Sequence, residues 1–107
     1  MTRFEQEDGS IVELSCDGDH VRFVDGADSF RVPLEWMTLA LIANARRPQL
    51  VIFEGEDRRV LMNRCIGCGA LLVRPRAELG RLLHLDVVTL RDFARDLNAA
   101  MRRGRMN

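Results

Sequence analysis

The sequence contains no lysine and no tyrosine, and its only aromatic residues are five Phe and one Trp. It also lacks a long hydrophobic segment, since the unbroken apolar run in its most apolar region covers only residues 39–43. A helix that spans a bilayer needs about 20 apolar residues, so we expect no membrane segment. The sequence contains no motif of a phosphate-binding glycine loop, and no motif that combines a catalytic nucleophile with its general base. These absences favour a small intracellular binding module over an enzyme.

Cysteine is scarce as well, with only Cys16, Cys65 and Cys68 present. Disulfide-stabilised secreted domains use even numbers of cysteines, and the acidic first eight residues contain no apolar segment of the kind that a secretory signal needs. We therefore expect a cytoplasmic protein with reduced thiols. The length of 107 residues and the apolar content of 47% predict a single globular domain over residues 1–107.

The charges balance overall but are distributed unevenly along the chain. Residues 1–30 carry two arginines against eight acids, whereas residues 70–107 carry eight arginines against four acids. Either the acidic segment neutralises the basic one within the fold, or the basic third binds an anionic partner. For the second case we expect nucleic acid as the partner. The candidate contacts are the arginines of this third: Arg76, Arg91, Arg95, Arg102 and Arg103.

Alternating apolar and polar residues predict a hairpin near the N-terminus. The two runs are 11–16 and 20–24, and a two-residue turn within Asp17-Gly18-Asp19 places Cys16 on the apolar face and His20 on the other. Cys16 is therefore expected in the core, and His20 in solvent. Further strands are expected at 2–7, 29–32, 50–53, 58–63 and 70–73.

Two helices complete the expected fold. The first begins at Pro33, ends before Pro48 and is apolar on nearly every side from 34 to 45, which predicts a buried central helix. The second, from about 87 to 103, has one apolar stripe. We therefore predict an α+β fold, in which an antiparallel sheet built from hairpins packs on the buried central helix, with a C-terminal amphipathic helix. Each helix follows a set of strands, so the sequence also fits an internal duplication of a strand-strand-helix unit. In the corresponding alignment of the two helices, Leu39 is equivalent to Phe93.

The turn Cys65-Ile66-Gly67-Cys68-Gly69 resembles the metal-binding turn of zinc ribbons and rubredoxins. In such turns a glycine takes the positive φ that lets backbone amides point at the thiolates. The resemblance implies zinc as a cofactor, with Cys65 and Cys68 as ligands. A tetrahedral site needs four ligands, and the sequence contains no second pair of this kind. A second chain can supply its own pair across a dimer axis.

Two alternatives for these cysteines stay open. In a thiol-redox enzyme the motif lies where a helix N-terminus lowers a thiol pKa, but here it lies between two expected strands. Redox activity at Cys65 and Cys68 is nevertheless the enzyme function that fits the sequence best. The remaining interpretation is that both cysteines are small apolar residues in a tight glycine turn.

Residues 77–95 resemble the helix-turn-helix of mercury-resistance-type (MerR-like) regulators. The family pattern runs small-Glu-Leu-Ala-x-x-x-Gly-Val-x-x-x-Thr-Leu-Arg, and the matching residues are Glu78, Leu79, Thr89, Leu90 and Arg91. The resemblance implies that Asp86 caps a second helix whose start enters a major groove. His84 stands where the family has its turn glycine. The alternative is that 82–85 form a strand and that 87–103 form the helix that packs on it.

Two functions therefore remain open from the sequence. The first is nucleic-acid binding, in gene regulation, through the basic C-terminal third. The second is a protein–protein adaptor that is stabilised by zinc or by dimerisation.

Overall fold

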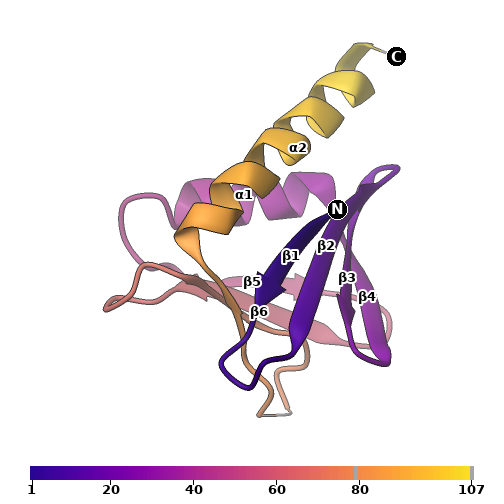
Figure 1. Cartoon of the computed structure of the whole chain (residues 1–107). Coiled ribbons are helices and arrows are strands. Elements are labelled where there is room, and N and C mark those ends of the chain that lie inside the picture. The colour runs from indigo at the N-terminus through magenta and orange to yellow at the C-terminus, as the bar shows by residue number, and fades with distance from the viewer. Residues whose placement is uncertain (79, 107) are drawn as a thin grey trace.

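The computed structural model describes residues 1–78 and 80–106, which form two four-stranded antiparallel sheets and two helices (Figure 1). The first sheet contains β1 (Thr2–Glu5), β2 (Ile11–Asp17), β3 (His20–Asp25) and β4 (Asp28–Pro33), and α1 (Leu34–Ala43) follows it. The second contains β5 (Val51–Glu54), β6 (Arg59–Arg64), β7 (Leu71–Arg74) and β8 (Leu83–Leu85), and α2 (Val87–Met106) follows it. The expected α+β class is confirmed, with two sheets where one was predicted.

The two halves of the chain repeat one topology, in which four sequential antiparallel strands precede a helix. The alignment that pairs Leu39 with Phe93 is wrong in register, however. Leu39 is 62% exposed, whereas Phe93 is fully buried. A shift of two residues pairs Met37 with Phe93 and Asn44 with Ala100, and all four of these are buried.

The first hairpin has the predicted register. Asp17 pairs with His20 across a two-residue turn, and Cys16 pairs with Val21, so Cys16 faces the core. Gly18, with φ of 63°, supplies the left-handed conformation that this turn requires. His20 is half-buried, and its Nδ1 lies 2.6 Å from a carboxylate oxygen of Asp19.

One continuous hydrophobic core lies between the helices and both sheets. The prediction that α1 is buried on all sides is wrong. Leu34, Met37 and Ala40 are buried, Trp36 and Leu41 are half-buried, and Leu39 and Ile42 are 62% and 66% exposed. The helix therefore packs through one face, while its opposite face carries aliphatic side chains into solvent.

Polar side chains connect the two sheets at their edges. The side-chain amide of Gln6, just beyond β1, donates to the backbone carbonyl of His84 at 2.9 Å and accepts from its backbone N–H at 2.8 Å. At His84 these two hydrogen bonds take the place of those that a further strand would make with β8. On the other side, the guanidinium of Arg58 donates two hydrogen bonds to Asp28, at 2.8 and 3.0 Å, and stacks over Phe30. These contacts join the first sheet to the second at two separate places.

The C-terminal end of α1 is held by a buried asparagine. The Asn44 side chain donates to the carbonyl of Ala40 at 2.9 Å and accepts from the backbone N–H groups of Gln49 and Arg64. It therefore joins the helix end, the following loop and β6. Trp36 adds a second link, because its indole N–H donates to the carbonyl of Ile52 in β5.

Candidate functional site

Three of the predicted nucleic-acid contacts lie together on α2. Arg91, Arg95 and Arg102 are separated by four and seven residues, so they share one side of the helix, and all three side chains are exposed. Arg95 lies 3.8 Å from Asp92 on its own helix. Within the part of the chain that the structure describes, neither Arg91 nor Arg102 has a carboxylate oxygen within 4.0 Å. These three arginines are called the arginine stripe below.

The other two predicted contacts differ in placement. Arg103 is exposed on α2 but lies on the flank of the helix that also carries Asp92 and Asp96. Arg76 is not near α2: its side chain donates to the backbone carbonyl of Asp57, in the turn after β5, at 3.3 Å. The structure therefore brings together the helical arginines and leaves Arg76 outside the group.

Residues 77–95 contain one described helix. Residues 77 and 78 form a turn, 83–85 form β8, and helical structure begins at Val87, so the strand alternative describes this region. Leu79, which the helix-turn-helix pattern includes, lies outside the described residues. The predicted cap is present, because Asp86 accepts hydrogen bonds from the backbone N–H and the hydroxyl of Thr89 at 2.9 and 2.8 Å.

Several carboxylates of the acidic N-terminal segment pair with arginines other than those of α2. Arg58 pairs with Asp28, and Arg81 pairs with Asp25 at 2.8 Å and Asp8 at 3.5 Å. The hydrogen bonds from Arg58 hold the pKa of Asp28 below its ordinary value. Residues 1–33 carry three arginines against eight acids, whereas the helices and their end residues, 34–47 and 87–104, carry six arginines against three acids. The molecule therefore has an acidic sheet and a basic helical layer.

The exposed aliphatic side chains of α1 were not anticipated from the sequence. Leu39 and Ile42 lie one turn apart on the outer face, between Glu35 and Arg46 at its two ends. Thr38, one turn before Ile42, lines a groove with Asn98, Met101 and Arg102 of α2. Of the arginine stripe, Arg102 therefore borders a groove between the two helices, opposite Thr38 of α1.

The predicted cysteine turn joins β6 to β7 and lies at the surface. Cys68 is exposed, Cys65 is half-buried, and Gly69 has the expected positive φ, 75°. The backbone N–H of Cys68 points at the sulfur of Cys65, with N and Sγ 3.5 Å apart. The Cys68 thiol, followed by the amides of Cys68 and Gly67, lowers the pKa of the Cys65 thiol. The turn lies between two strands, as expected, and not at a helix N-terminus of the kind that redox enzymes use.

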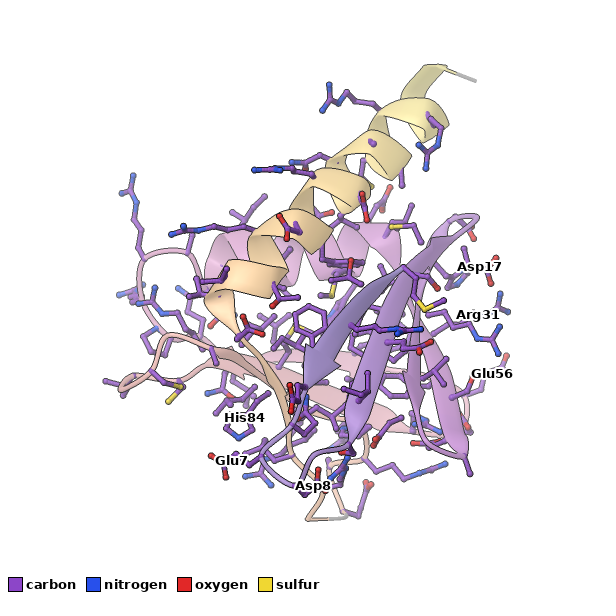
Figure 2. The ribbon with its side chains drawn as sticks, in the orientation of Figure 1. Glu7, Asp8, Asp17, Arg31, Glu56 and His84 are labelled. Carbon is purple, nitrogen blue, oxygen red and sulfur yellow. The ribbon has the colours of Figure 1, made fainter. Side chains whose placement is uncertain are left out.

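A groove of about 630 Å³ separates β4 from the turn between β5 and β6. Asp17, Arg31 and Glu56 mark its rim (Figure 2), and Arg31 lies 3.7 Å from Asp17. Three arginines and three carboxylates line it. The guanidinium of Arg58 is already bound to Asp28, and its Nε is buried without a hydrogen-bond acceptor. This balanced charge favours neither an anionic nor a cationic ligand.

Comparison with known proteins identifies no relative. No family model matches the chain, no curated protein matches its sequence, and no solved structure matches its fold. Within the described residues, no helix has the length and apolar character needed to cross a bilayer. Function must therefore be argued from the surfaces described above.

Proposed function

We propose that this protein is a non-enzymatic binding module that contacts the phosphate backbone of nucleic acid through α2. The observation that supports the proposal is the arginine stripe, in which three exposed guanidinium groups project from one side of a helix. Arginine suits phosphate because its planar fork donates two parallel hydrogen bonds. The pairing of the acidic sheet with Arg58 and Arg81 leaves these helical arginines available to a partner.

Such contacts position the partner without reading its sequence. Phosphate contacts carry no direct base information. Among the described residues of 77–95, α2 is not preceded by the first helix that a helix-turn-helix uses. We therefore expect comparable affinity for different duplex sequences. Arg46 and Arg47, exposed after α1, extend the positive charge of the helical layer.

Titration of a fluorescent duplex at several salt concentrations tests this function. Each phosphate that the protein neutralises contributes about 0.9 to the slope of log affinity against log salt. Replacing Arg91 and Arg102 with alanine should lower affinity for every duplex and reduce the slope by roughly two units. Arg74→Ala is the matched control, because Arg74 is exposed on β7, away from the stripe. Unmeasurable binding at low salt, or equal losses in both variants, contradicts the proposal.

A protein–protein adaptor is the second candidate, and the aliphatic face of α1 favours it. The exposed side chains of Leu39 and Ile42 have no favourable interaction with a phosphate backbone. Aliphatic residues beside arginine are typical of protein interfaces. A photocrosslinking residue at position 39 should capture a defined protein in cells, and Ile42→Glu should abolish the product. A crosslinker at exposed position 22, on β3, is the control. A product that survives Ile42→Glu contradicts the adaptor function.

A further inference from the structure

The turn between β6 and β7 is closed by its own backbone hydrogen bonds and presents two cysteines. Its ends are closed by hydrogen bonds from the Cys65 N–H to the Ala70 carbonyl, at 2.8 Å, and from the Gly69 N–H to the Cys65 carbonyl, at 3.2 Å. The backbone N–H of Cys68 faces the Cys65 sulfur, and Gly69 takes a positive φ at the end of the turn. Amide donors around a sulfur stabilise its charged form, which is the form that binds metal ions.

One chain supplies only half of the ligands for a tetrahedral ion. Zinc in structural sites takes four ligands, with cysteine thiolates preferred. No group of three or more Cys, His, Asp or Glu side chains able to hold a metal is found among the described residues. The third cysteine, Cys16, belongs to β2 of the other sheet, where burial raises its thiol pKa. The missing ligands therefore have to come from outside the chain.

The surface of the turn indicates what can supply them. Ile66, between the two cysteines, is 89% exposed, although a large aliphatic side chain gains stability only when it is covered. The turn projects from the side of the molecule (Figure 1). A second copy related by a two-fold axis would bring an identical pair of thiols to the same point and would cover Ile66 of both copies.

We propose that Cys65 and Cys68 from two copies of this chain bind one zinc ion as a tetrathiolate. The ion replaces the protons of four thiols, so binding releases four protons and leaves a site of net charge −2. The amide donors of both turns offset part of that charge. The site joins the two turns and does not involve the arginine stripe, so it stands or fails independently of nucleic-acid binding.

Cobalt substitution and native mass spectrometry test the site on the full-length, reduced, metal-free chain. Cobalt(II) should give the intense visible bands of a tetrahedral tetrathiolate, saturating at one ion per two chains, and zinc should displace it. Native mass spectra should show a dimer that carries one zinc ion and a monomer that carries none. Cys65→Ser and Cys68→Ser should each lose the cobalt spectrum and the dimer, whereas Cys16→Ser should keep both.

Three outcomes would overturn the proposal. These are saturation at one ion per chain, a dimer that survives Cys65→Ser in the presence of zinc, and the absence of tetrahedral bands. Loss of fold does not confuse the result, since the turn is at the surface and the far-ultraviolet circular dichroism of each serine variant should match that of the unaltered protein.

Discussion

Replacement of Asn44 by alanine should be among the most destabilising changes of a polar residue in this protein. Asn44 is 3% exposed, and its carbonyl oxygen accepts from the backbone N–H groups of Gln49 and Arg64 at 2.8 and 2.9 Å. Alanine removes the acceptor for both. A donor left without a partner costs about 1–3 kcal/mol, and both amides are only partly buried, so we expect a loss of about 2–3 kcal/mol.

Urea unfolding followed by circular dichroism measures this loss directly. For a domain of this size the same loss should lower Tm by roughly 8–15 °C. Asn44→Leu separates hydrogen bonding from packing, because leucine fills the site but also leaves both N–H groups unpaired. It should therefore be as unstable as Asn44→Ala. Asn98→Ala, on the exposed side of α2, should change stability by less than about 0.5 kcal/mol.

The reasoning would be refuted by two results. A loss below about 0.5 kcal/mol for Asn44→Ala would show that water replaces the side chain as acceptor. Recovery of stability in Asn44→Leu would show that the side chain contributes through its volume.

Two further predictions concern the ion pair between the sheets and the two faces of α1. Arg58 lowers the pKa of Asp28, so the pair stabilises the fold above the ordinary aspartate pKa of about 4 and is lost as the pH falls through the lower folded value. Asp28→Asn should then cost about 1–2 kcal/mol at pH 7, and a difference from the unaltered protein that stays constant down to about pH 2 would contradict this cause. Met37→Ala should cost about 2–5 kcal/mol, whereas Leu39→Ala should cost less than about 0.5 kcal/mol, and equal losses in urea unfolding would place both side chains in the core.

Local patterns predicted the elements that depend on neighbouring residues. The register of the first hairpin followed from the alternation of 11–16 and 20–24, because a shift by one residue would expose the apolar set. The apolar stripe of α2 was predicted because it depends on residues within one or two turns, and the Asp86 cap followed from the resemblance of residues 77–95 to a helix-turn-helix. The positive φ of Gly69 followed from the resemblance of its turn to metal-binding turns.

Arrangements that depend on distant residues were not predicted. The apolar composition of α1 did not indicate how many of its faces would pack against other elements. In the structure only one face packs against the core. The two sheets contact each other through Gln6 and His84 and through Asp28 and Arg58, which are far apart in sequence. The groove at β4 is lined by residues of both sheets and has no sequence motif.

Comparison of the two halves indicates which features the fold itself requires. In the first half, β2 and β3 are joined by the two residues Gly18 and Asp19, whereas the equivalent strands β6 and β7 are joined by the six residues 65–70. A hairpin of this topology closes with two residues, so the longer turn, with both of its cysteines and an exposed isoleucine, is not needed for closure. The outer faces of the helices differ in the same way, because α1 exposes Leu39 and Ile42 where α2 exposes arginines. The repeated topology does not require these exposed residues, and they do not stabilise the core. Contact with a partner is the simplest physical reason for their presence on the surface.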